Sequence, residues 1–177
     1  MTEPIETFIA REVFAELGGF VLSDPGELDR HHGGSASGLD LLELYGTSDE
    51  GDAVAAGGIA IPVMGLEAGY YTLVVRGAEA TAHLTGPPRL VSSGWVLHVV
   101  SDRLCLSGAG YLKRWDPNGP RVLHPVVPAG WYEVEVRCGF GGVDGEEPVI
   151  EFVLRAATDR PRFAADPSAT FDFPSTA

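Results

Sequence analysis

Residues 131–140 alternate between apolar and polar side chains, and this stretch constrains the fold more than any other part of the chain. The apolar side chains are Tyr132, Val134, Val136, Cys138 and Phe140, and the polar ones between them are Glu133, Glu135 and Arg137. A period of two is typical of a half-buried antiparallel strand, because successive side chains point to opposite faces. Residues 141–147 are rich in glycine and acids, and 148–155 alternate again. The sequence therefore predicts a β-hairpin here.

Similar short runs recur along the chain at spacings of about ten residues. They lie at 7–17 (a strand or a short helix), 19–23, 57–63, 70–76, 95–100, 103–107, 111–114 and 122–127. The run at 95–100 is apolar on both faces, which predicts a central strand. The 23 glycines and 13 prolines separate these runs and argue against long helices. We expect an all-β, or mostly β, fold: an antiparallel β-sandwich or flattened barrel with at most one or two short helices.

The length of 177 residues suits one domain. We expect residues 1–160 to form a single β-sandwich domain. Within it, residues 24–39 carry few apolar side chains and many turn formers, which predicts a flexible surface loop. Residues 161–177 are expected to be a Pro-rich C-terminal tail that lies along the surface or frays.

The net charge of −13 is unevenly distributed. Residues 1–52 hold 12 acidic and 2 basic residues, a balance of −10, whereas residues 53–132 have a balance of +2 and residues 133–177 a balance of −5. Such a field repels nucleic acid and anionic membranes and attracts a basic protein or a cation. The alternative is that the acidity only keeps the protein soluble. The prevalence of Arg, Ala, Gly and Pro indicates a GC-rich bacterial genome.

The N-terminus has neither the basic flank nor the apolar run of a signal peptide, and no stretch approaches the roughly 18 apolar residues of a membrane helix. We expect a cytoplasmic protein whose two cysteines, Cys105 and Cys138, are free thiols. The sequence indicates no particular oligomeric state.

The chain carries only incomplete matches to catalytic and metal-binding motifs. Residues 33–37 (Gly-Gly-Ser-Ala-Ser) lack the last glycine of a nucleophile elbow. Adjacent His31 and His32 have no third ligand at a defined spacing, which favours a solvated loop over a metal site. The remaining histidines, His83, His98 and His124, lack the H-x-H spacing of a cupin. We therefore predict no catalytic residue, no metal and no cofactor, and expect a protein that is not an enzyme.

Residues 128–137 (Pro-Ala-Gly-Trp-Tyr-Glu-Val-Glu-Val-Arg), the acidic gap after them and residues 148–157 resemble the C-terminal hairpin of small bacterial β-sandwich proteins that include the competence protein J nuclease inhibitor. Residues 8–24, with Phe-Val-Leu-Ser-Asp at 20–24, resemble the first strands of that group. The chain has Leu-Arg-Ala-Ala at 154–157 where the pattern has a Trp-Pro ending. The resemblance implies a sandwich fold and inhibition of a nuclease-like toxin, and it carries over no site residues.

The charge and the resemblance together favour an acidic, non-enzymatic binding protein, an inhibitor or immunity protein for a basic partner such as a nuclease toxin. The predicted contact residues are Asp49, Glu50, Asp52, Trp131, Glu133 and Glu135. Two alternatives stay open. One is a ligand- or carbohydrate-binding β-sandwich that uses Trp95, Trp115 or Trp131 as a platform. The other is a metal-dependent enzyme on a cupin-like frame, with a site assembled from the scattered histidines.

Overall fold

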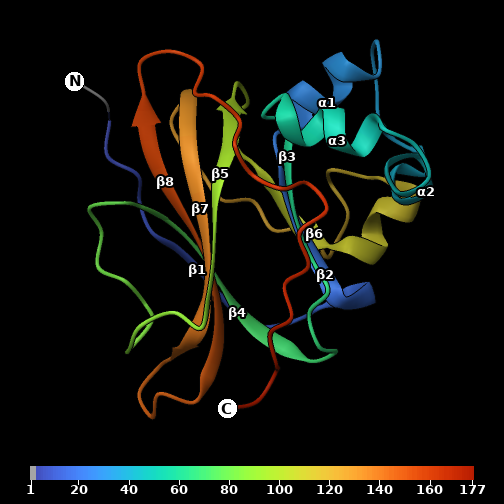
Figure 1. Cartoon of the computed structure of the whole chain (residues 1–177). Coiled ribbons are helices and arrows are strands. Elements are labelled where there is room, and N and C mark those ends of the chain that lie inside the picture. The colour runs from blue at the N-terminus through green and yellow to red at the C-terminus, as the bar shows by residue number, and fades with distance from the viewer. Residues whose placement is uncertain (1–2) are drawn as a thin grey trace.

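The computed structural model describes residues 3–177, and its strands form two sheets (Figure 1). The larger sheet has the order β1-β4-β8-β7-β5, and its strands are β1 (Phe8–Phe14), β4 (Tyr70–Gly77), β8 (Glu147–Ala157), β7 (Gly130–Gly141) and β5 (Leu90–Val99). The smaller sheet has the order β3-β2-β6, and its strands are β3 (Ala60–Met64), β2 (Gly19–Ser23) and β6 (Cys105–Gly108). The protein is thus mostly β, as predicted, and neither described sheet closes into a barrel.

The hairpin predicted from the alternation is confirmed as β7 and β8. The two strands pair antiparallel, with Val134 opposite Leu154 and Val136 opposite Phe152. All four of these side chains are buried in the main core. Burial of alternate residues therefore fixes the register, because a slip by one residue would turn the apolar set toward solvent.

Two expectations about the strands are wrong. The larger sheet is mixed rather than antiparallel, because β8 returns to the sheet between β7 and β4 and runs parallel to β4. Strand β5 lies at the edge of the sheet, not at its centre. The backbone of this edge is partly paired, because the N–H of His98 donates to the carbonyl of Gly58 and the carbonyl of Gly94 accepts from the N–H of Ala164. An edge paired in this way is protected from association with other strands.

The expectation of at most one or two short helices is also wrong. The described chain contains α1 (Pro25–His31), α2 (Leu41–Gly46) and α3 (Glu50–Ala56), and the 3-10 helices η1 (Glu16–Gly18) and η2 (Ala109–Arg114). Asp24, which lies in the segment predicted as a loop, begins a helix instead, and so does Asp40. Asp24 accepts a hydrogen bond from the N–H of Glu27, with Pro25 in the first turn, and Asp40 accepts one from the N–H of Glu43. Helix α1 lies inside the segment 24–39 predicted as a flexible loop.

The main core lies between the two sheets and includes part of the C-terminal tail. Phe20 and Ile61 of the smaller sheet belong to the same buried cluster as Phe152 of the larger one. The tail, expected along the surface, contributes Phe171 and Phe173, which are 1% and 2% exposed. In Figure 1 the red C-terminal segment runs from the top of β8 along the smaller sheet, where the N–H of Phe171 donates to Met64. The tail thus joins the two sheets.

No helix within residues 3–177 combines the length and the apolar character needed to cross a membrane.

Candidate partner-binding surface

Helices α1, α2 and α3 lie on the side of the smaller sheet that faces away from the larger one (Figure 1). They pack on that sheet through a second apolar cluster, separate from the main core. Its buried members include Val21, Leu28, Leu41, Val54, Ile59 and Leu112. The helices are therefore held by apolar side chains beneath them, and their outer faces remain free for polar residues.

The helical segment is strongly acidic. Residues 24–52 hold eight acidic residues and one basic residue, a balance of −7. Two of the acids are buried and engaged: Asp24 accepts hydrogen bonds from three backbone N–H groups and the hydroxyl of Ser101, and Glu27 pairs with Arg30. The exposed acids Glu43, Asp49 and Asp52 take part in no ion pair within residues 3–177. Uncompensated negative charge is thus concentrated on α2 and α3.

The structure brings the predicted contacts Asp49, Glu50 and Asp52 together at the start of α3. Asp49 is the residue before the helix, and its side chain makes no capping hydrogen bond. Asp52 is exposed in the first turn. Glu50 is half-buried, and its Oε1 lies 3.1 Å from Nε2 of His31. Asp49 and Asp52 can therefore meet a partner directly, whereas Glu50 is already engaged.

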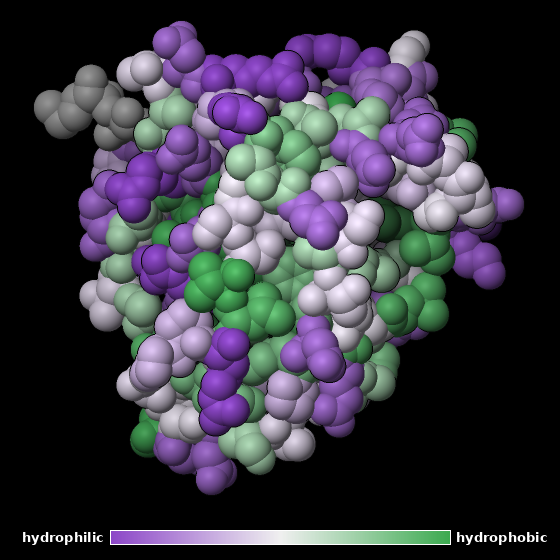
Figure 2. Space-filling model, in the orientation of Figure 1, coloured by the Kyte–Doolittle hydropathy of each residue, from purple (hydrophilic) through white to green (hydrophobic). Residues whose placement is uncertain are grey.

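An apolar pocket of about 200 Å³ opens beside these acids. Its walls come from the smaller sheet, α2, α3 and η2, and include Val21, Leu41, Tyr45, Val54, Met64 and Leu112, with Asp52 also in the lining. Figure 2 shows hydrophilic residues along the top of this face of the molecule, above an area where apolar residues gather. An apolar recess beside exposed carboxylates is the arrangement expected of a protein-binding surface, with an apolar centre and a polar rim.

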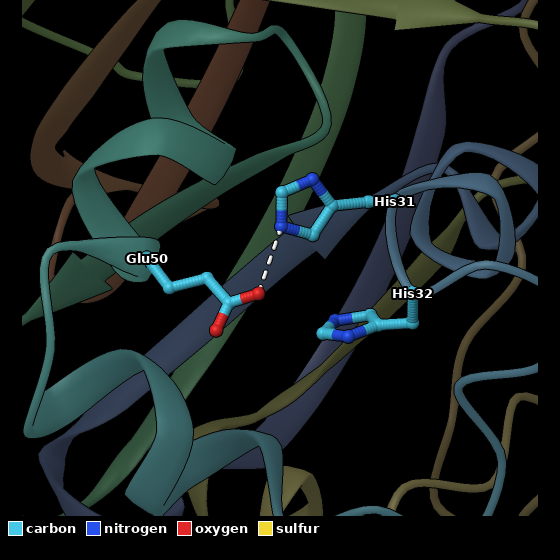
Figure 3. Close-up of side chains that lie close together, drawn as sticks. All are labelled: His31, His32 and Glu50. Carbon is cyan, nitrogen blue, oxygen red and sulfur yellow. Dashed lines mark hydrogen bonds and ion pairs between the residues drawn. The ribbon is translucent and has the colours of Figure 1, made fainter.

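His31, His32 and Glu50 converge between α1 and α3 (Figure 3). The rings of His31 and His32 are 5.0 Å apart, and Nε2 of His32 lies 2.6 Å from the hydroxyl of Tyr45. Burial, together with the charge of His31, lowers the pKa of His32. Burial also raises the pKa of the Tyr45 hydroxyl, and Glu50 adds to this effect. At neutral pH this site therefore presents a neutral imidazole and a neutral phenol.

The other predicted contacts, Trp131, Glu133 and Glu135, lie on β7. Trp131 packs against Gly58, just after the C-terminal end of α3, whereas Asp49 and Asp52 lie at the start of that helix. The ring of Trp131 stacks on His98 at 4.1 Å, and the guanidinium of Arg160 lies 5.4 Å from its centroid. Trp131 is therefore half-buried, although it lies on the same face of β7 as Glu133 and Glu135, which the alternation directs toward solvent.

Glu133 and Glu135 share their surface with basic residues. A concavity there is also lined by Arg137, Arg155 and Arg162. Burial opposes ionisation of Glu135, but hydrogen bonds from Arg137 and Ser93 outweigh it and hold the pKa of this carboxyl below its usual value. This surface is consequently not acidic in the way that α2 and α3 are.

The residues behind the alternative functions are dispersed or buried. Trp95 and Trp115, two of the three tryptophans considered as a sugar platform, are 1% and 2% exposed. His83, His98 and His124 do not meet, and the one group of three or more potential metal ligands among residues 3–177 is His31, His32 and Glu50.

Cys105 and Cys138 are free and buried in different apolar clusters. Burial raises the pKa of each thiol to about 12, so both are protonated and unreactive at neutral pH.

Sequence reasoning missed the pocket and the contribution of Glu43 and Tyr45. A signal was present: Leu41, Leu42 and Tyr45 follow Asp40 at the spacing of an amphipathic helix with an N-terminal cap. Six residues are too few for that pattern to stand out from a turn.

The fold is similar to that of a solved nuclease inhibitor. ComJ from Bacillus subtilis, an inhibitor of the DNA-degrading activity of NucA, superposes with a TM-score of 0.52 at 10% sequence identity, over 89% of this chain and 99% of ComJ. The product of crocagin biosynthetic gene J gives a TM-score of 0.48 at 12% identity, over 86% of this chain and 98% of that protein. No family model and no curated protein sequence matches the chain. The expected resemblance to competence protein J is thus confirmed at the level of the fold.

Proposed function

We propose that this chain is a non-enzymatic binding protein of the inhibitor or immunity type, which covers the cationic surface of a nuclease-like partner. The likeness in fold to ComJ supports the class of function, since ComJ is an inhibitor of a DNA-degrading enzyme. Fold alone does not select a partner. The location of the contact surface has to come from the chemistry of this chain.

The exposed carboxylates of Glu43, Asp49 and Asp52 carry the proposal. A nuclease binds phosphates through basic side chains, so its substrate groove attracts other anions of suitable spacing. Carboxylates on short helices present such anions without the flexibility of a loop. Their long-range attraction accelerates encounter, and their close approach excludes DNA from the groove.

The pocket beside Asp52 supplies an anchor for one basic side chain of the partner. Lys and Arg carry an apolar stem below the charged group, and the stem gains free energy when it packs on an apolar wall. With the stem in the pocket, the cation lies near the carboxylate of Asp52 at its rim. A desolvated anchor of this kind contributes more to affinity than exposed ion pairs at the periphery.

Trp131, Glu133 and Glu135 remain proposed contacts of lower rank. Trp131 lies beside the C-terminal end of α3, away from the acids at the start of that helix. The arginines beside Glu133 and Glu135 reduce the attraction of that concavity for a basic partner. We also place this function in the cytoplasm, a proposal supported by the free thiols of Cys105 and Cys138.

The test is an assay of DNA degradation by NucA and a panel of other basic nucleases, with and without the purified chain. The variant Glu43→Gln/Asp49→Asn/Asp52→Asn removes three exposed charges from α2 and α3. A matched control, Asp144→Asn/Glu146→Gln/Asp159→Asn, removes three exposed charges elsewhere. We expect the first variant to weaken inhibition by about tenfold or more, which corresponds to about 1.4 kcal/mol, and to reduce its salt dependence.

The control should inhibit as the parent does. Equal losses in both variants would mean that net charge alone matters and that the helices are not the contact surface. Absence of inhibition and of binding across the whole panel would overturn the proposed function itself.

A further inference from the structure

Three side chains with metal-binding atoms meet at the junction of α1 and α3. His31 is the last residue of α1, His32 is the residue that caps it, and Glu50 begins α3. One ligand atom from each lies within 4.8 Å of the others. Figure 3 shows the two imidazole rings and the carboxylate pointing toward one another. The third ligand that the sequence did not indicate is thus supplied by a residue 18 positions after His32.

The spacing of these atoms suits a small divalent ion. Two ligands bound tetrahedrally at roughly 2.0–2.1 Å lie about 3.3 Å from each other. Nε2 of His31 and Oε1 of Glu50 are already 3.1 Å apart. The ligand atoms of all three residues lie within 4.8 Å of one another, so small shifts of the side chains would bring them to coordination distances, and the exposure of His31 leaves room for water as a fourth ligand.

The hydroxyl of Tyr45 orients the second histidine. It lies 2.6 Å from Nε2 of His32, and its ring stacks on that imidazole with centroids 5.8 Å apart. With Nε2 engaged, Nδ1 is the nitrogen of His32 left for an ion. Metal-binding histidines are commonly held through their second ring nitrogen in this manner, which fixes both the tautomer and the ring plane.

The geometry points to a binding site for a divalent transition-metal ion, with Zn²⁺ as the representative, formed by His31, His32 and Glu50 and supported by Tyr45. Two imidazoles and one carboxylate are ligands that Zn²⁺ accepts, whereas Mg²⁺ and Ca²⁺ require oxygen ligands. The bound ion would join the end of α1 to the start of α3. It would also place a positive charge within the acidic surface, leaving Asp49 and Asp52 outside the site.

The experiment is calorimetric titration of the full-length, tag-free protein with ZnCl₂, after removal of metals with a chelator. We expect one ion per chain, with no binding of Mg²⁺. His32→Gln and Glu50→Gln should each weaken Zn²⁺ binding by about 100-fold or more, and Tyr45→Phe by about tenfold, the range found for groups that orient a ligand. His124→Gln removes an imidazole from another part of the molecule and should change the affinity less than about twofold.

A second measurement needs no variant. Imidazole NMR signals of the parent protein should move for His31 and His32 on addition of one equivalent of Zn²⁺, and those of His83, His98 and His124 should not. The site is refuted if the parent protein binds no stoichiometric Zn²⁺, if His32→Gln and Glu50→Gln bind it as the parent does, or if the perturbed signals belong to the other histidines. Because Glu43, Asp49 and Asp52 lie outside the site, the triple variant used for inhibition should bind Zn²⁺ as the parent does.

Discussion

The larger sheet contains a buried ion pair, whereas the helical segment carries exposed acids that are not paired. In the sheet, Arg76 of β4 and Glu151 of β8 are 2% and 0% exposed and form an ion pair of 3.1 Å. The other carboxylate oxygen of Glu151 accepts the backbone N–H of His83 at 2.6 Å. On the helices, Glu43, Asp49 and Asp52 are exposed and form no ion pair with another residue of the described chain, 3–177. The pair of Arg76 and Glu151 therefore acts within the fold, whereas the three exposed carboxylates on and beside α2 and α3 are available to a partner.

Loss of the buried ion pair should have the largest effect on stability. Glu151→Ala leaves Arg76 charged, buried and without its carboxylate, which should lower the free energy of unfolding by about 3–5 kcal/mol. Urea unfolding followed by tryptophan fluorescence measures this change. The double variant Arg76→Met/Glu151→Leu buries no charge and should lose less than Glu151→Ala does. A loss below about 1 kcal/mol in Glu151→Ala would contradict the assignment, since that is the value of an exposed pair.

Asp24 belongs to the helical segment, but like Glu151 of the sheet it is buried and fully engaged in hydrogen bonds. It begins α1 and also accepts the N–H groups of Val100 and Ser101, at 2.8 and 2.9 Å, directly after β5. Asp24→Ala leaves these donors without a partner and should cost roughly 3 kcal/mol. In Asp24→Ala, amide hydrogen exchange should accelerate relative to the parent more in α1 than in β7 and β8. Uniform loss of protection over both regions would indicate instead that the helices and the sheet unfold as one unit.

The same division explains what the sequence could predict. The hairpin β7–β8 was predictable because every second residue in both strands, such as Val134 and Phe152, is apolar and buried in the core. That alternation is visible in the sequence. The parallel pairing of β4 with β8 was not, because the paired residues lie 77 positions apart along the chain, and no local pattern indicates which strands will pair.

In the helical segment, local signals were ambiguous rather than absent. Asp24-Pro25 begins a turn or a helix equally well, and the buried Leu28 that decides between them is a single residue. Adjacent His31 and His32 gave no reason to expect Glu50 nearby, since only the packing of α3 on the smaller sheet brings it there. The acidic contacts Asp49 and Asp52 could be chosen from charge density alone, but the pocket beside them required tertiary structure.

The smallest expected effect is a difference in the pH at which His32 of the helical segment and Glu135 of the sheet each influence stability. The folded state lowers the pKa of His32 below its ordinary value of 6.5, chiefly through burial and then through His31. As the pH falls through that ordinary value, the unfolded chain therefore takes up a proton at His32 before the folded chain does, and stability decreases until the folded histidine is also protonated. Glu135 of the sheet has a lowered pKa as well, from its ordinary 4.5, so its contribution is lost only at more acidic pH.

Unfolding in urea at pH 7.5 and 5.5, with a chelator present to remove metal ions, tests this order. The decrease in stability over that interval should be smaller in His32→Gln than in the parent, because the variant has no imidazole to protonate at that position. Ser93→Ala, which removes a hydrogen bond to Glu135, should leave the decrease unchanged over the same interval. An identical pH dependence in His32→Gln and the parent would show that the junction of α1 and α3 does not disfavour the imidazolium, and the contrast between the helices and the sheet would then be confined to the acids.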